Sequence, residues 1–406
     1  MRRVVITGMG AVTPVGNDVE SFWNSLVNGK NGIGRVTKFD VTDFKATMAA
    51  EVKDFDPLVY LEKNEVRKND MFTVYALSAA QQAMTDSKLE MDPERLGVYF
   101  GSGIGGFSTF ENEHTVLMEK GAKRVSPMFV PKMISNIAAG NIAIKFNAQG
   151  PCVSPTTACA TGTTAIGEAY RAIKHGYCDA AITGGTEASI SPLAFAGFIN
   201  CMALSKVDDP NAASVPFDKR RAGFVMGEGA GALVVEEYEH AVARGAKIYA
   251  EICGYGSTCD AHHVTAPDPE GKGGARAIAQ AIEDAEITDP STVYINAHGT
   301  GTPLNDKTET LAIKKVFGDD AYKVHISSTK SMTGHMLGAA GAVEAIASAM
   351  ALGNQIIPPT INYVEPDEEC DLDYTPNTAK ETKLETALSV SLGFGGHNAC
   401  IALRRI

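Results

Sequence analysis

The sequence predicts an α/β protein built from two similar halves. Short runs of β-branched residues bounded by glycine, of which the chain has 40, alternate with longer stretches in which apolar residues recur at helical spacing. The same order of strand and helix patterns occurs twice along the chain. No low-complexity linker separates the two parts, so we expect residues 1–247 and 248–406 to pack face to face as halves of one unit.

The first half is expected to begin with a strand at Arg3–Thr7. Residues 73–87 have helical spacing, and Val98–Phe100 forms a strand that leads into the turn GSGIGG at 101–106. The segment TTACATGTTAIGEAYRAIKHG, residues 156–176, predicts a strand end, a sharp turn and a helix, and DAAITGG predicts the next strand. The apolar stripe of that helix comprises Ile166, Ala169, Tyr170 and Ile173.

The second half repeats this order. Strands are expected at Ile248–Gly256, Val293–Ala297 and Val324–Thr329, with a helix at 275–285 between the first two. GHMLGAAGAVEAIASAMAL predicts a further helix. ALSVS and ACIALRR, joined by GFGGHN, predict a closing hairpin.

Composition excludes several classes of protein. Apolar residues make up 44% and charged residues 21% of the 406, as in soluble globular proteins. We find no run of about 18 uncharged apolar residues and no signal-peptide pattern, so no membrane partner is expected. The eight cysteines occur singly, which favours reduced thiols in the cytoplasm. A formal charge of −12 argues against nucleic-acid binding.

Cys159 is the candidate nucleophile. We expect it at the start of a helix, where free backbone N–H groups and the macrodipole favour an anion and lower the pKa of a thiol. Thiolate would then be available near neutral pH. The small residues Ala158, Ala160 and Gly162 leave room for an acyl group. A lone cysteine is more often buried and inert, so this feature needs support from elsewhere.

Two histidines give that support. His298 ends a strand and opens HGTGTP, while His335 lies in SSTKSMTGHMLGAAG. Both are expected at strand–loop–helix junctions, where α/β proteins build ligand sites. Together with Cys159 they form a nucleophile-and-imidazole set.

At this point the sequence resembles a known family. TACATG around Cys159, AHGTGTPLND around His298 and SSTKSMTGHMLGAAGAVE around Lys330 and His335 are similar to the motifs of β-ketoacyl-(acyl-carrier-protein) synthases, members of the thiolase superfamily. GGTEASI, FDKRRAGFVMGEGAG and SLGFGGHNA match as well, in family order over nearly the whole chain. The pattern is most similar to the stand-alone type II bacterial enzymes that elongate long acyl chains.

The resemblance implies a five-layered αβαβα thiolase-like fold, a homodimer, and a decarboxylating Claisen condensation. Cys159 would carry the acyl chain as a thioester. Neutral His298 and His335 would donate hydrogen bonds to the enolate formed from malonyl-acyl-carrier protein, and the backbone N–H groups of Cys159 and Phe394 would form an oxyanion hole. No metal or redox cofactor is implied, because phosphopantetheine arrives on the acyl-carrier protein.

The same resemblance assigns supporting roles. Lys330 would order the histidines, and Glu344 would be its buried neighbour. Ile104 would line the acyl tunnel, with Phe394 as its gate. Leu392 stands where relatives usually have phenylalanine, so chain-length preference is the property most open to change. The hydroxyls of Thr300, Thr302 and Thr265 would face the pantetheine amides.

Local basic residues suggest where the carrier docks. Acyl-carrier proteins are acidic, and a basic patch on an acidic enzyme would steer them to the entrance. We assign this role to Lys63, Arg67 and Lys68, with Lys206, Arg220 and Arg221 as possible additions.

Several alternatives were weighed. Gly8-Met9-Gly10 lacks the third glycine of a dinucleotide fingerprint, and the adjacent His262 and His263 have no partner at metal-ligand spacing. A thiolase should carry a second cysteine in the C-terminal glycine-rich turn, where this chain has His397. A type I bacterial synthase, a stand-alone polyketide ketosynthase and a carrier-binding module without turnover remain open.

Overall fold

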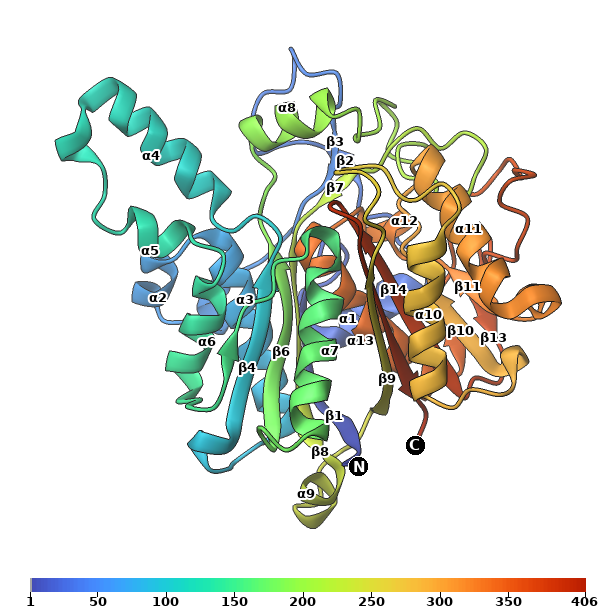
Figure 1. The fold of residues 1–406 in the computed structure, drawn as a ribbon. Helices are drawn as coiled ribbons and strands as arrows, with labels where there is room; N and C mark the ends of the chain where they lie inside the picture. The colour runs from blue at the N-terminus through green and yellow to red at the C-terminus, as the bar shows by residue number, and fades with distance from the viewer. Residues whose placement is uncertain (1) are drawn as a thin grey trace.

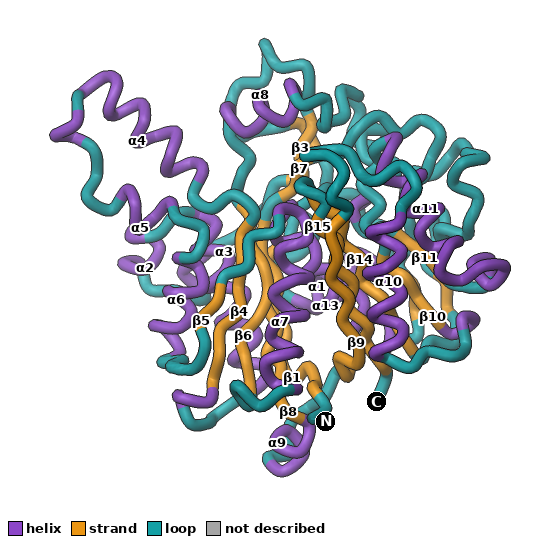
Figure 2. The backbone as a smooth tube through the Cα atoms, viewed as in Figure 1, coloured by secondary structure: helices purple, strands orange, loops and turns teal. Residues whose placement is uncertain are grey.

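The central feature of the computed structural model, which describes residues 2–406, is a ten-stranded mixed sheet (Figures 1 and 2). Its strand order is β11-β10-β14-β15-β9-β1-β8-β6-β4-β5. In that order the strands are β11 (His325–Ser327), β10 (Val293–Asn296), β14 (Thr386–Gly393), β15 (His397–Arg404), β9 (Ala250–Cys259), β1 (Val4–Val12), β8 (Gly229–Glu237), β6 (Ala180–Glu187), β4 (Leu96–Ser102) and β5 (Cys152–Val153).

The sheet consists of two five-stranded halves with the same pattern. In one half β1 and β8 pair antiparallel, β8 and β6 antiparallel, and β6, β4 and β5 parallel. In the other, β9 and β15 pair antiparallel, β15 and β14 antiparallel, and β14, β10 and β11 parallel. The halves meet where β1 pairs with β9, from Val4↔Ile252 to Ile6↔Ala250. The predicted repetition is therefore visible in the strand pairing.

Helices complete five layers (Figure 1). α3 (Met71–Ser87) and α6 (Ile137–Phe146) pack on the outer face of the first half, and α10 (Lys272–Asp284) packs on the second half beside α11 (Pro303–Phe317). α7 (Thr161–Lys174) and α13 (Ala340–Asn354) lie between the halves and contact strands of both. This arrangement confirms the αβαβα layers and the thiolase-like fold.

The two middle helices are buried because small residues let them approach each other closely. A Cβ added to Gly162 of α7 would lie 2.7 Å from the backbone nitrogen of Ala342 in α13, and one added to Gly167 would lie 2.3 Å from the Tyr255 ring. The stretch Leu337–Asn354 is long and apolar enough to cross a membrane by composition alone, but 83% of it is buried inside the protein. It is a core helix of the middle layer.

Most predicted elements lie where the sequence placed them, and two differ. The strand expected at Val324–Thr329 ends at Ser327, and Lys330 begins the short helix α12 (Lys330–Thr333). The helix expected from residue 334 begins with a 3-10 turn at Leu337–Ala339 and becomes α13 only at Ala340. Both departures arise where His335 is held by backbone pairing to Met226 instead of entering a helix.

A lobe that the sequence analysis did not identify projects from the first half. It contains α4 (Phe107–Lys120) and α5 (Phe129–Met133), which stand away from the sheet in Figures 1 and 2. α8 (Pro192–Asn200) lies above the middle layer, toward the end of the molecule where α7 begins.

Candidate active site

A cavity of about 370 Å³ brings the predicted nucleophile and both predicted histidines together. These residues come from three separate segments of the chain, so the folding of both halves is needed to form the site. Eight predicted site residues line this one cavity: Cys159, Thr265, His298, Thr300, Thr302, His335, Leu392 and Phe394.

Cys159 occupies a strained turn in front of α7. The 3-10 turn Ala158–Ala160 precedes Thr161, and Ala158 has a φ of 49°, in the left-handed region that non-glycine residues rarely adopt. The Thr161 hydroxyl donates to the Ala158 carbonyl at 2.7 Å and accepts from the Thr157 N–H at 3.0 Å. The turn therefore presents the thiol into the cavity with only 8% of the residue exposed.

The predicted low pKa of Cys159 is wrong. Burial raises the pKa of the thiol to about 12, although the charge of Lys330 and a hydrogen bond from the backbone N–H of Phe394 both act to lower it. The cost of burying the anion exceeds those favourable contributions. The thiol is therefore neutral at pH 7.

His298 and His335 face each other across the cavity. The centroids of the two rings are 5.2 Å apart, and the ring planes are nearly perpendicular. His298 is 3% exposed and His335 is 2% exposed. The carboxylate of Glu309 accepts from the backbone N–H groups of His298 and Gly299, at 2.6 and 2.7 Å. Two hydrogen bonds hold the backbone of His335. Its N–H donates to the Val225 carbonyl, and its carbonyl accepts from the Gly227 N–H.

Both imidazoles are neutral. Burial lowers the pKa of each well below 6.5, and the nearby charge of Lys330 lowers it further. Within residues 2–406, neither Nδ1 atom has a hydrogen-bond partner. Each ring can therefore offer one N–H as a donor without carrying a charge.

Lys330 and Glu344 form a buried ion pair beneath the histidines. Both side chains are 1% exposed, and the ammonium donates to one carboxylate oxygen of Glu344. Burial raises the pKa of Glu344 while Lys330 opposes that shift. Because the charge of Lys330 reaches Cys159, His298 and His335, its predicted supporting position agrees with the geometry.

The turn after β14 closes one side of the site. The Phe394 N–H points at the Cys159 sulfur. A Cβ on Gly393 would lie 3.3 Å from the backbone nitrogen of Cys159, so the two backbones are in close contact. The backbone N–H groups of Phe394 and Cys159 therefore both lie beside the nucleophile, where a bound acyl group would have its carbonyl carbon.

Aromatic residues that the sequence analysis gave no role connect this turn to the histidines. The centroid of the Phe198 ring lies 6.5 Å from that of Phe394 and 5.7 Å from that of Phe224. The Phe224 ring in turn makes a T-shaped contact with the His335 ring, with a centroid distance of 5.0 Å. Phe224 lies in the motif FDKRRAGFVMGEGAG, and the resemblance of that motif to the family could have identified it as a site residue. Glu309 follows His298 by eleven residues on α11 and had no distinguishing pattern.

Ile104 belongs to the apolar cluster that surrounds Cys159. It is partly buried there, in the turn that follows β4. Leu392 lines the cavity and its side chain approaches Gly274 of α10, so it also has a place beside the site.

In the exposed loop that carries Thr265, His263 has a structural role. The Nδ1 atom of His263 accepts hydrogen bonds from the backbone N–H groups of Thr265 and Ala266, both at 3.1 Å. His263 thereby shapes the loop at the mouth of the cavity.

The basic residues divide into two groups. Lys63, Arg67 and Lys68 are exposed on α2 (Lys63–Lys68), away from the cavity lining. Arg221 is 8% exposed and paired with Asp367, so the suggestion that it offers a free charge is wrong. The guanidinium of Arg220 donates two hydrogen bonds to the Asp218 carboxylate, so its charge is also paired.

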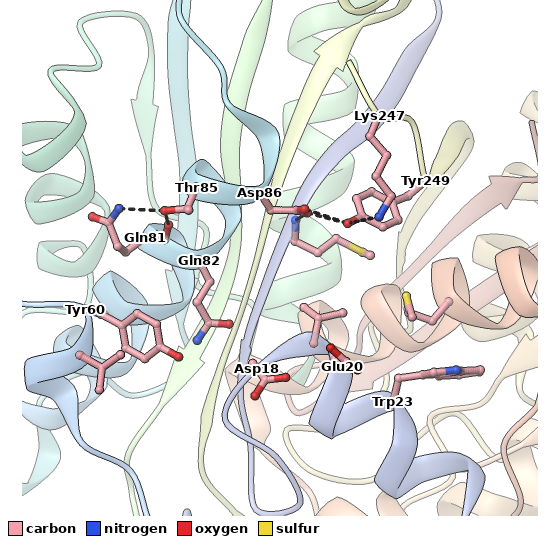
Figure 3. A pocket seen from close by; sticks show the side chains of 14 residues that line it. Asp18, Glu20, Trp23, Tyr60, Gln81, Gln82, Thr85, Asp86, Lys247 and Tyr249 are labelled. Carbon is pink, nitrogen blue, oxygen red and sulfur yellow. Dashed lines mark hydrogen bonds between the residues drawn. The ribbon is translucent and has the colours of Figure 1, made fainter. Parts of the chain in front are cut away.

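A larger hollow of about 910 Å³ shares no residue with this site. Figure 3 shows Trp23, Asp86 and Tyr249 among its walls, with Asp86 accepting from the Tyr249 hydroxyl. No cysteine or histidine lines it.

Comparison with known proteins adds two observations from sequence. The family model described as "Beta-ketoacyl synthase, N-terminal domain" matches residues 1–241, and its C-terminal counterpart matches 249–364. Proteins named 3-oxoacyl-[acyl-carrier-protein] synthase 2 from Synechocystis sp. and from Staphylococcus aureus strain COL are each 51% identical to this chain. Each alignment covers 100% of the chain and 98% of the relative.

Solved structures agree over the full length. A β-ketoacyl synthase from Burkholderia phymatum superposes with a TM-score of 0.93 at 35% identity, covering 100% of both chains. A ketosynthase solved in complex with its type II polyketide acyl-carrier protein superposes at 0.92 and 37% identity, covering 100% of this chain and 99% of that one.

Proposed function

This chain belongs to the β-ketoacyl synthase family, and from that premise we propose that it is a 3-oxoacyl-(acyl-carrier-protein) synthase of type II. It is an acyltransferase of fatty-acid synthesis that joins an acyl group to malonyl-acyl-carrier protein, giving 3-oxoacyl-acyl-carrier protein and CO2. The observation that carries the proposal is the meeting of Cys159, His298, His335 and the Phe394 N–H at one cavity.

In the first half-reaction Cys159 takes the acyl group from the carrier. Its sulfur attacks the thioester carbonyl, and the backbone N–H groups of Cys159 and Phe394 stabilise the oxyanion of the tetrahedral intermediate. The C–S bond to pantetheine breaks, and the proton lost by Cys159 leaves with the carrier thiol. The neutral imidazoles line the same cavity and are the candidates to relay that proton.

In the second half-reaction malonyl-acyl-carrier protein replaces the first carrier. Its C–C bond to the carboxylate breaks, releasing CO2, and the electron pair forms an enolate whose oxygen accepts from His298 and His335. The enolate carbon attacks the carbonyl of the Cys159 thioester and forms the new C–C bond. Collapse of the tetrahedral intermediate breaks the C–S bond, and the departing Cys159 thiolate takes a proton from water to restore the neutral thiol. Removal of one oxyanion donor in such steps costs about 2.7–4 kcal/mol.

These steps balance without an external electron donor or acceptor, so we assign no redox cofactor and no metal. The reacting groups arrive on carrier phosphopantetheine, with Thr265, Thr300 and Thr302 facing the pantetheine amides at the mouth. An acyl-carrier protein bound to a ketosynthase in the similar polyketide complex supports that partner. We also infer cytoplasmic location from the eight free cysteines.

We propose a homodimer that forms along the open edge of the sheet. β5 is the terminal strand, and Val153 on it is 44% exposed. Apolar side chains of the projecting lobe are also exposed, notably Met118 at 72% and Val130 at 55%. An unpaired strand edge and exposed apolar side chains each favour self-association. Met118→Lys with Val130→Lys should halve the mass measured by light scattering.

We place the boundary between the halves at residues 247 and 248, in the connection between α9 (Tyr238–Ala243) and β9. The halves are expected to fold together, because β1 pairs with β9.

Product analysis tests the proposed function. The purified protein is incubated with malonyl-acyl-carrier protein and acyl primers from C6 to C16, saturated and cis-unsaturated, and products are identified by mass spectrometry. We expect 3-oxoacyl-acyl-carrier protein two carbons longer than each accepted primer. Repeated condensation without intervening reduction would instead identify a polyketide ketosynthase, and no product at all would overturn the proposal.

A further inference from the structure

One buried carboxylate in the site region has no part in the reaction steps above. Glu187, the last residue of β6, is 0% exposed and forms no ion pair among the described residues. Burial raises the pKa of Glu187 to about 7, against the hydrogen bonds it accepts. A carboxyl group is costly in such a place unless its contacts repay the desolvation.

The contacts of Glu187 join two turns near the nucleophile. One oxygen, Oε2, accepts from the Gly103 N–H at 2.9 Å and from the Gly338 N–H at 3.1 Å. Gly103 precedes Ile104 of the acyl pocket, and Gly338 lies three residues after His335. A single oxygen atom therefore links the acyl-pocket turn to the histidine turn.

The second oxygen extends the link. Oε1 accepts from the Ser102 hydroxyl at 3.0 Å and from the Ser189 hydroxyl at 3.2 Å. Ser102 in turn accepts from the Gly105 N–H at 2.9 Å. Ile104 is thus held on both sides, by Gly103 directly and by Gly105 through Ser102.

The glycines of these turns fit the carboxylate closely. A Cβ on Gly103 would lie 2.7 Å from Oε2 and 3.4 Å from the carbonyl oxygen of Ala158, the residue before Cys159. A Cβ on Gly338 would lie 2.4 Å from the Gly103 nitrogen and 3.0 Å from Oε2. Only residues without a side chain permit three segments to meet here.

We propose that Glu187 is a positioning residue that fixes Ile104 relative to Cys159 and thereby sets how sharply the enzyme discriminates acyl-chain length. The inference rests on the proposed condensing activity. It assigns chain-length control partly to a residue that acts on the acyl pocket indirectly, by holding the 102–105 turn.

The test is a double-mutant cycle on the length profile. Glu187→Ala and Ile104→Ala are made singly and together, and turnover is measured with C6 to C16 primers. Losing one or two buried hydrogen bonds should reduce the ratio between the best and worst primer by roughly 2- to 10-fold. If Glu187 acts through Ile104, its removal changes little in the Ile104→Ala background, so the two effects are non-additive.

Two further variants separate positioning from general stability. Glu187→Gln can keep an oxygen toward Gly103 and Gly338 while its amide donates to the serine hydroxyls, so it should restore most of the wild-type profile. Glu236→Gln alters a carboxylate on β8 that is equally buried but accepts from Arg244 and from Thr7 of β1. It should lower the melting temperature without reshaping the profile.

The outcomes of these measurements distinguish a positioning role of Glu187 from a role in stability alone. Additive effects of Glu187→Ala and Ile104→Ala, or a uniform loss of rate that tracks melting temperature as in Glu236→Gln, would overturn the inference. Should Glu187→Ala not fold, Ser102→Ala removes the Gly105 arm alone and must still flatten the profile. Wild-type protein that makes no 3-oxoacyl product would instead contradict the proposed function.

Discussion

Burial sets the protonation state of the side chains that touch the reacting atoms. The thiol of Cys159 and the rings of His298 and His335 are all neutral at pH 7, because each would lose solvation on becoming charged. A neutral imidazole is the better donor here, because it can stabilise an enolate without first trapping the malonyl carboxylate as an ion pair.

The role of Cys159 can be tested by two substitutions. Cys159→Ser should abolish acylation and condensation, since the hydroxyl is a much weaker nucleophile without a dedicated base. Cys159→Gln should keep or raise malonyl decarboxylation, because the amide resembles the acylated state. Intact-mass measurement after incubation with acyl-carrier protein that bears an acyl group checks the assignment, and an unmodified wild-type Cys159 would refute it.

The two histidines should make decarboxylation insensitive to pH on the acid side. Their folded pKa values lie well below 6.5, so protonation does not begin as the pH falls from 8 to 6. We expect a flat rate over that range in Cys159→Gln, measured as CO2 release. An inflection near pH 6.5 would contradict it.

The same shifts have a consequence for stability. The unfolded chain binds protons at these histidines below about pH 6.5 whereas the folded chain does not. Their contribution to stability is therefore complete above pH 6.5 and is lost as the pH falls toward their depressed folded values. His298→Ala and His335→Ala should each reduce this slope of unfolding free energy with pH, and should cut decarboxylation by roughly 100- to 1000-fold.

Among the helices and strands, the sequence predicted those whose apolar pattern can be recognised within one short segment. The stripe of α7 is buried as expected, and the hairpin of β14 and β15 pairs as expected. The site residues were identified because their motifs resemble a family. The pKa of Cys159 could not be predicted in this way, since its desolvation depends on segments that are distant in sequence. The bridging contacts of Glu187 depend on the same long-range packing.

The acyl pocket gives a prediction at this scale. Ile104 is β-branched, stiff and packed in the Cys159 cluster, so a larger side chain there should obstruct the path of the acyl group. Ile104→Phe should block primers beyond a few carbons, and Ile104→Ala should help long primers more than short ones. Turnover across C6 to C16 measures this, and an unchanged profile in Ile104→Phe would show that the chain takes another route.

Leu392 provides the companion variant. It lies two residues before Phe394 and packs partly on the core of the second half. Leu392→Phe should shift chain-length preference by changing how the Phe394 turn moves. Malonyl decarboxylation should change little, because Leu392 lies near Phe394 in sequence and offers no hydrogen-bond donor to the enolate. A loss of decarboxylation equal to the loss of condensation would contradict this separation.

At the scale of the whole molecule, charge decides how the carrier approaches. The chain has 48 acidic and 36 basic residues, so an acidic carrier is repelled on average and must find a local basic region. Lys63, Arg67 and Lys68 are exposed together on α2, and the Lys132 ammonium of α5 donates to the Arg67 carbonyl beside them. These four cations form one surface next to the projecting lobe.

Arg67→Glu with Lys68→Glu should therefore raise the KM for acyl-carrier protein by on the order of 10-fold, mainly by slowing association. The difference from wild type should shrink as salt increases, because the Debye length is about 10 Å at 0.1 M. The matched control is Lys323→Glu with Lys383→Glu. Lys383 is 72% exposed at the end of β14 opposite Gly393, and Lys323 is 62% exposed before β11, so neither is near the cavity mouth. An unchanged KM in the α2 variant would show that the carrier docks elsewhere. An equal rise of KM in the control would show that only the net charge of the enzyme matters.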